Sequence, residues 1–188
     1  VHTNGDTLMH TAAYAGQLNV MDWLAKNKAN VNQANYNGET PLYGAAMVGH
    51  LQVVQWLTMH GADSNLENND WKTPLYIAVE NGHFDVVKWL WPKTDKSLLL
   101  DPKNPTVPIL HQAAMKGHTE IVRWLVEEKK VDVNLKSAFH GYTALHLAIE
   151  NKQIETIRML VRELKANINI KNNDDRTPLD LAKLADHV

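Results

Sequence analysis

Apolar residues in this chain form pairs of short helical segments, each of which ends at a glycine. Before Gly49, the residues Leu42, Ala45 and Ala46 make a narrow stripe of mostly small side chains. The segment that ends at Gly61 has a wider apolar set at helical spacing, namely Leu51, Val53, Val54, Trp56 and Leu57. Glycine supplies the positive φ that ends many helices. The pattern therefore predicts a helix A that starts at residue 41 and a helix B that starts near residue 50.

The residues before helix A predict its start and the turn that precedes it. Thr40 is suited to cap the helix, and Pro41 suits its first position, where no backbone N–H is needed. Asn37 and Gly38 form a dipeptide that favours the positive φ values of a tight turn. We therefore expect a projecting turn, two helices and a return to the next turn.

This unit repeats along the whole chain. Thr40-Pro41-Leu42-Tyr43 recurs 33 residues later as Thr73-Pro74-Leu75-Tyr76. The other copies are Thr7-Leu8-Met9-His10, Pro108-Ile109-Leu110-His111, Thr143-Ala144-Leu145-His146 and Thr177-Pro178-Leu179-Asp180. A fixed period of this length indicates stacked repeats. We expect a single domain over 1–188, with repeats at about 2–34, 35–67, 68–102, 103–137 and 138–171 and a partial repeat at 172–188.

Composition and charge exclude several other classes. The chain has 188 residues, 44% of them apolar and 21% charged, with a net charge of −2 and no cysteine. No apolar run approaches the roughly 18 residues of a membrane span, so we expect no membrane insertion. No basic cluster marks a nucleic-acid surface. The missing cysteines fit a reducing compartment. We expect an intracellular, cytoplasmic monomer, cut from a longer chain because it lacks an initiator methionine.

The motif Thr-Pro-Leu-(His/Tyr)-x-Ala, followed by Gly-His, an aliphatic helix B and Gly-Ala-Asp-x-Asn, resembles the ankyrin repeat. The resemblance covers essentially residues 2–186. It implies an all-α solenoid of L-shaped helix-turn-helix units with projecting β-turns, whose concave face most often binds another protein. It also implies that His10, His111 and His146 form hydrogen bonds near the capping threonine.

The pattern breaks between the third and fourth repeats. After Trp91, the chain carries Pro92, Pro102 and Pro105 and two added residues, and Pro108 replaces the capping threonine. Loss of such a cap typically costs about 1 kcal/mol. We expect helix B to stop near Trp91 and a nonstandard loop to follow it.

Tryptophans and histidines at repeated positions are interpreted as structural. Trp23, Trp56, Trp89 and Trp124 share one helix B position, and we expect them to stack in or at the edge of the core. The histidines lie a repeat or more apart, so they predict no joint metal site. We find no catalytic constellation and no cofactor motif, and we expect a noncatalytic protein.

The candidate functional residues are large or charged side chains at positions that the fold does not specify. The resemblance places the end of helix A and the turn tips on the concave side. The candidates there are Tyr14, Tyr36, Met47, Trp71, Glu80, Met115, Phe139 and Tyr142. Aromatic residues and methionine are enriched in protein interfaces. The sequence thus predicts a protein-binding module. The alternative is a recognition or spacer arm of a larger multidomain enzyme or effector.

Overall fold

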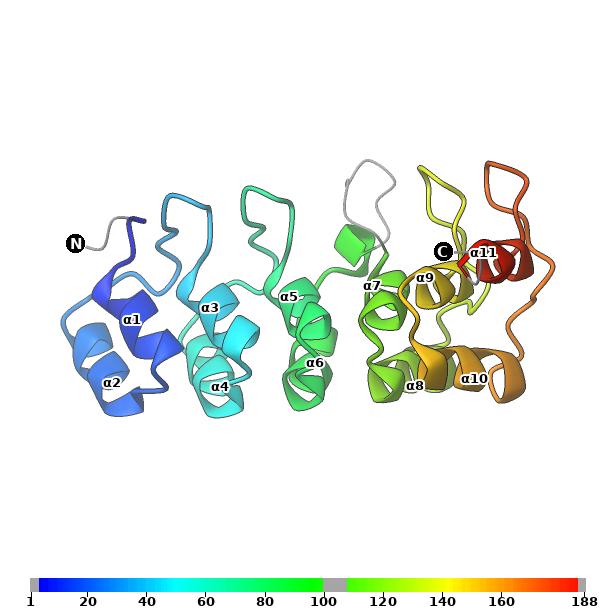
Figure 1. The fold of residues 1–188 in the computed structure, drawn as a ribbon. Coiled ribbons are helices and arrows are strands. Elements are labelled where there is room, and N and C mark those ends of the chain that lie inside the picture. The colour runs from blue at the N-terminus through cyan, green and yellow to red at the C-terminus, as the bar shows by residue number, and fades with distance from the viewer. Residues whose placement is uncertain (1–3, 100–107, 186–188) are drawn as a thin grey trace. The chain divides into compact units, whose positions relative to one another are not determined.

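The computed structural model describes residues 4–99 and 108–185, and all regular secondary structure in these ranges is helical (Figure 1). The chain divides into two compact units, residues 1–106 and 107–188, which are described separately.

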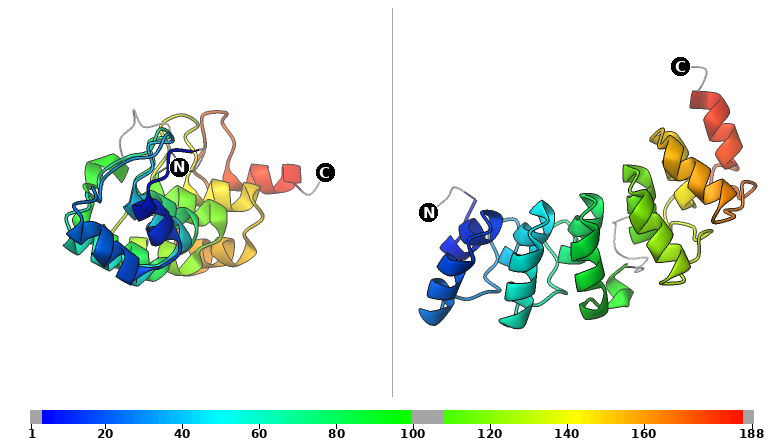
Figure 2. Two further views of the ribbon diagram at one scale, coloured as in Figure 1. Left: turned by 90° about the vertical axis from the view of Figure 1, so that its left-hand side faces the viewer. Right: turned by 90° about the horizontal axis from the view of Figure 1, so that it is seen from below.

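The first unit contains three helix pairs. They are α1 (Leu8–Tyr14) with α2 (Leu18–Lys26), α3 (Pro41–Val48) with α4 (Leu51–Met59), and α5 (Pro74–Glu80) with α6 (Phe84–Leu90). Helix α3 packs against both α1 and α5, so these three helices form one row (Figure 1). The helices α2, α4 and α6 form a second row, which Figure 2 shows from another direction. The turns that precede α3 and α5 project beyond the first row.

The second unit repeats this arrangement. Helix α7 (Ile109–Lys116) pairs with α8 (Thr119–Glu127), and α9 (Ala144–Glu150) pairs with α10 (Ile154–Arg162). Helix α9 packs between α7 and the last helix, α11 (Pro178–Ala185). The sequence predicted all of these helix pairs and, for the last helix, residues 179–185.

Threonine caps and small residues explain the helix A row. Thr40 Oγ1 accepts a hydrogen bond from the backbone N–H of Tyr43 at 3.2 Å, and Thr73 does the same for Tyr76 at 3.1 Å. Gly49 ends α3 in the left-handed conformation with φ of 79°. Alanines at the centre of the row are fully buried, which lets neighbouring helices approach closely. At the turn before α3, Gly38 has a positive φ of 77°, whereas Asn37 does not, so the prediction for that dipeptide holds for the glycine alone.

Three buried histidines tie helix A to the next turn. His10 Nδ1 accepts the backbone N–H of Thr7 at 3.1 Å, so the ring is neutral and its Nε2–H donates to the carbonyl oxygen of Glu39 at 2.9 Å. His146 makes the same pair of bonds with Thr143 and Arg176. These contacts confirm the role implied by the ankyrin resemblance. His111 makes only the second bond, to the carbonyl of Tyr142 at 2.8 Å.

The tryptophan position in helix B is less buried than predicted. Trp124 is 6% exposed, but Trp23 is 61% exposed, so the prediction that it packs in the core is wrong. Trp56 and Trp89 are half-buried. Each still joins neighbouring repeats, because its indole N–H donates to a side chain of the preceding helix B. The acceptors are Asp22 Oδ1 for Trp56, at 2.7 Å, and Thr58 Oγ1 for Trp89, at 3.1 Å.

The third repeat ends differently from the others, as the prolines predicted. Helix α6 ends at Leu90 and is followed by two 3₁₀ helices, η1 (Trp91–Lys93) and η2 (Lys96–Leu99). The buried Thr94 hydroxyl donates to the carbonyl of Leu90 at 3.1 Å, where the second repeat has Gly61. The rest of the predicted irregular loop, residues 100–107, lies outside the described residues.

Candidate partner-binding surface

The turn tips of the first unit are held together by a ladder of backbone hydrogen bonds. The N–H of Tyr36 donates to the carbonyl of Asn4 at 3.0 Å, and the N–H of Asn69 donates to the carbonyl of Asn37 at 2.9 Å. The side chain of Asn69 adds a bond to the carbonyl of Tyr36 at 3.0 Å. Each tip is therefore positioned by the tip before it, and a side chain on a tip projects from an ordered support.

Two predicted aromatic residues lie on this ladder and are exposed. Tyr36 is 74% exposed, and its ring lies close to the backbone of Gly5. Trp71 is 56% exposed and occupies the repeat position of Gly38. It has φ of 62°, a left-handed conformation that costs a residue with a Cβ about 1 kcal/mol or more. The structure thus presents a tryptophan where glycine is the unstrained choice.

The ends of helix A place Tyr14 and Met47 beside each other's repeats. Both side chains are half-buried. The Tyr14 ring packs over Gly44 of the next helix A, where a Cβ would lie only 2.7 Å from Tyr14 Cζ. The backbone carbonyls of Tyr14 and Met47 accept the Nε2–H of His50, at 3.1 Å, and of His83, at 3.0 Å. The histidines that begin helix B therefore fix the residues at the end of the preceding helix A.

The surface around these residues is acidic. Burial, followed by the charges of Glu39 and Asp6, raises the pKa of Tyr14 to about 12. Burial and the charges of Glu39, Glu80 and Asp70 raise the pKa of Tyr43 as well. Glu80, another predicted site residue, is half-buried and pairs with Lys72 Nζ at 2.7 Å. Sequence reasoning missed the carboxylates Asp6, Glu39 and Asp70, although their signal was present in the residues that flank each capping threonine.

The second unit holds the other three predicted residues. Phe139 is 63% exposed on a turn tip, where its carbonyl accepts the side-chain N–H of Asn173 at 2.9 Å. Tyr142 is half-buried and stacks on His146, with ring centroids 5.4 Å apart and planes 1° from parallel. The half-buried Met115 follows the pattern of Met47, because its carbonyl accepts Gln153 Nε2–H at 3.1 Å. The structure thus brings together Tyr14, Tyr36, Met47, Trp71 and Glu80 in one unit and Met115, Phe139 and Tyr142 in the other.

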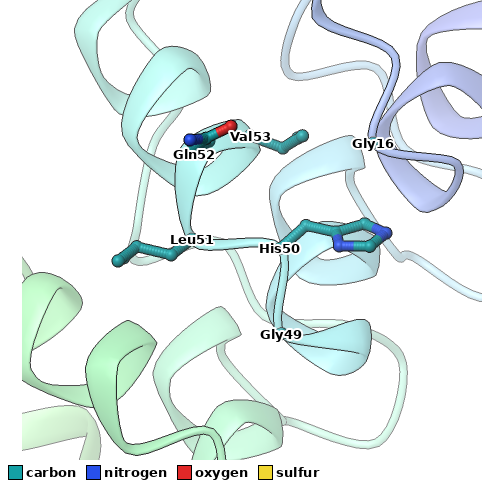
Figure 3. Close-up of a pocket in the computed structure, with 6 residues that line it drawn as sticks. All are labelled: Gly16, Gly49, His50, Leu51, Gln52 and Val53. Carbon is teal, nitrogen blue, oxygen red and sulfur yellow. The ribbon is translucent and has the colours of Figure 1, made fainter.

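A hollow of about 260 Å³ lies between the first two repeats and is lined by Gly16 and residues 49–53. Figure 3 shows the His50 ring directed toward the loop that carries Gly16, while Leu51 points the opposite way. Since His50 Nε2 already bonds the carbonyl of Tyr14, this hollow offers a packing surface rather than a reactive group. Across residues 4–99 and 108–185, no group of three or more potential ligand side chains is placed to hold a metal ion. In the same residues, no helix is long and apolar enough to cross a membrane.

Comparison with known proteins identifies the family. The model described as ankyrin repeats (3 copies) matches residues 1–68, 45–137, 92–172 and 110–188. The protein therefore belongs to the ankyrin-repeat family, as its tetrads and glycines predicted. The crystal structure of the human ASB11 ankyrin repeat domain is similar, with a TM-score of 0.77 and 22% sequence identity over 94% of this chain and 92% of that chain. At this identity the likeness shows the fold alone. No curated protein matched the chain.

Proposed function

We propose that the first unit binds a partner protein through a tip surface, defined as Tyr14, Tyr36, Met47, Trp71 and Glu80. Ankyrin repeats are generally protein-interaction modules and are typically noncatalytic. The observation that carries the proposal is the exposed Trp71 in a left-handed conformation. Strained backbone of this kind is concentrated at functional sites, and tryptophan is a frequent anchor of interfaces.

The second unit offers a smaller surface of the same kind. Phe139 projects from a turn tip, and Tyr142 and Met115 lie partly exposed near it in sequence register. We propose that these residues contact the same class of ligand, a folded or extended protein segment.

The charge of the tip surface favours a basic partner. Asp6, Glu39 and Asp70 surround the aromatic rings, and their fields are strong enough to shift tyrosine pKa values. Arginine and lysine gain both from carboxylates and from the faces of exposed aromatic rings. A partner segment with arginine or lysine next to an apolar residue therefore fits this surface best.

Affinity capture with the 188-residue chain, followed by titration with the protein retained, tests the proposal. We expect Trp71→Ala and Met47→Glu to weaken binding, with about a thirtyfold loss for an anchor whose truncation costs about 2 kcal/mol. Binding should also weaken with added salt. The matched control is Lys88→Ala on α6, where the Lys88 side chain is 47% exposed and pairs with Asp85. Unchanged affinity in both variants would reject the tip surface.

The finer assignments remain predictions: five full repeats and a partial sixth, a single noncatalytic domain, a monomer and a cytoplasmic location. Sedimentation velocity of the chain, with one species at the monomer mass, checks the oligomeric state.

A further inference from the structure

The outer side of the first helix pair exposes residues that later repeats bury. We call this surface the N-terminal face and define it as Leu8, Thr11, Gln17, Val20 and Trp23. Leu8 is 69%, Val20 41% and Trp23 61% exposed. At the position of Val20, by contrast, Val53 and Val86 are each 1% exposed. Terminal repeats normally carry a polar outer face, so an apolar one requires an explanation.

In the following repeats, the equivalent residues bond to the repeat before them. Trp56, at the position of Trp23, donates its indole N–H to Asp22 at 2.7 Å, and Trp89 donates to Thr58 at 3.1 Å. His50, at the position of Gln17, donates to the carbonyl of Tyr14 at 3.1 Å. The N-terminal face therefore carries the groups that join one repeat to its predecessor.

Gln17 is competent for the same bond, because a glutamine performs it elsewhere in the chain. In the second unit, Gln153 stands at this position and its Nε2–H donates to the carbonyl of Met115 at 3.1 Å. Gln17 has the same side chain, at an exposed position. The face thus combines apolar area with donors that suit a helix A carbonyl and a helix B oxygen.

The backbone before α1 also has the conformation that follows a preceding repeat. Gly5 has φ of 80°, close to the 77° of Gly38 at the same position in the second repeat. The carbonyl of Asn4 accepts the N–H of Tyr36 just as the carbonyl of Asn37 accepts that of Asn69. Residues 4–7 therefore form the second arm of a turn, and in the later repeats the first arm of that turn leaves a preceding helix B.

We propose that the N-terminal face binds a further ankyrin repeat of the same polypeptide, located before residue 1. In that repeat, a carbonyl at the end of helix A accepts the Gln17 amide, and a side-chain oxygen on helix B accepts the Trp23 indole N–H. Val20 and Leu8 pack against the helices of that repeat. This continues the interface seen between the first and second repeats.

The test extends the chain with its own second repeat. A copy of residues 35–67 is placed directly before His2, which preserves the 33-residue register and supplies equivalents of Thr58 and the Met47 carbonyl. We expect the extended protein to unfold at a higher urea concentration and to show slower amide hydrogen exchange in α1 and α2. Val20→Glu should lower the urea midpoint of the extended protein and leave that of the 188-residue chain unchanged. Met59→Glu, at a position 71% exposed on α4, is the control and should change neither.

Two results would overturn the proposal. The first is an extended protein whose exchange in α1 and α2 is unchanged and which tolerates Val20→Glu as well as the 188-residue chain does. The second is self-association of the 188-residue chain in sedimentation velocity, abolished by Val20→Glu, which would assign the face to a second copy.

Discussion

Pro108 leaves the buried Nδ1 of His111 without a hydrogen-bond donor. In the first and fifth repeats, Thr7 and Thr143 present a backbone N–H to the equivalent nitrogen at 3.1 Å. Proline has no N–H and no hydroxyl, and His111 Nδ1 has no partner among the described residues. The fourth repeat thus keeps the histidine and lacks the residue that completes its hydrogen bonding.

Pro108→Thr should stabilise the protein. The substitution restores a cap, typically about 1 kcal/mol, and provides a donor for a buried acceptor whose isolation costs about 1–3 kcal/mol. Proline's effect on the unfolded chain offsets about 0.4–1 kcal/mol of this. We expect a net gain of about 1 kcal/mol in the free energy of unfolding, measured by urea titration. Thr143→Val, which removes a hydroxyl from the intact version, should have the opposite effect. A destabilised Pro108→Thr variant would contradict this account of His111.

His111 should also make stability depend on pH. Burial lowers the pKa of His111 from 6.5 to about 4, so between these values the unfolded state binds more protons than the folded state. Stability is therefore fully present above pH 6.5 and is lost as the pH falls toward 4, by on the order of 3 kcal/mol for this group.

The matched variant for this pH dependence is His111→Tyr, because Tyr43 and Tyr76 occupy the same position in their repeats. Unfolding free energies of both proteins between pH 7 and pH 4 should show a shallower decline for the variant. Part of the decline should remain, since burial also lowers the pKa of His146. Equal slopes would show that His111 does not carry the effect.

Truncating the helix B tryptophans should give graded losses of stability. Trp124→Ala removes a side chain that is 6% exposed and should cost about 3–5 kcal/mol. Trp23→Ala, at a residue 61% exposed, should stay within about 0.5 kcal/mol. Trp56→Ala should fall between them, because it loses partial burial and the bond to Asp22. Chemical denaturation of the three variants measures the order, and a loss for Trp23→Ala as large as that for Trp124→Ala would contradict it.

Trp71→Gly should raise stability while it removes the proposed anchor. The left-handed backbone of Trp71 costs about 1 kcal/mol for a residue with a Cβ and nothing for glycine. We expect the free energy of unfolding to rise by about 1 kcal/mol in Trp71→Gly and to change little in Trp71→Ala, which keeps the Cβ. Identical stabilities of the two variants would mean that the conformation is not strained.

The helices and their repeat could be predicted because their determinants are local. A capping threonine, a proline at the first helical position and a glycine at the end specify each helix A from within a dozen residues. The burial of Trp23 could not be predicted in this way, since it depends on whether another repeat covers α2. The acidic character of the tip surface was hidden for a similar reason. Asp6 and Glu39 lie 33 residues apart in sequence, and stacking brings them to the same tyrosine.

Gly44→Ala should destabilise the protein, although alanine is the better helix former. In an open helix, this change gains about 0.5–1 kcal/mol. Here the new Cβ would lie 2.7 Å from Tyr14 Cζ and 2.9 Å from its Cε1, so the ring has to move. Overpacking of this kind typically costs about 1–3 kcal/mol, and we expect a net loss of about 1 kcal/mol.

A double-mutant cycle separates this contact from other effects of Gly44→Ala. In Tyr14→Ala the ring is absent, so adding Gly44→Ala should then be neutral or stabilising, and the coupling energy should exceed about 0.5 kcal/mol. Urea titration of the four proteins provides the cycle. Because Gly44→Ala displaces Tyr14 without removing it, the same variant should also weaken binding at the tip surface. Additive effects of the two substitutions on stability would show that Tyr14 does not pack on Gly44 in solution.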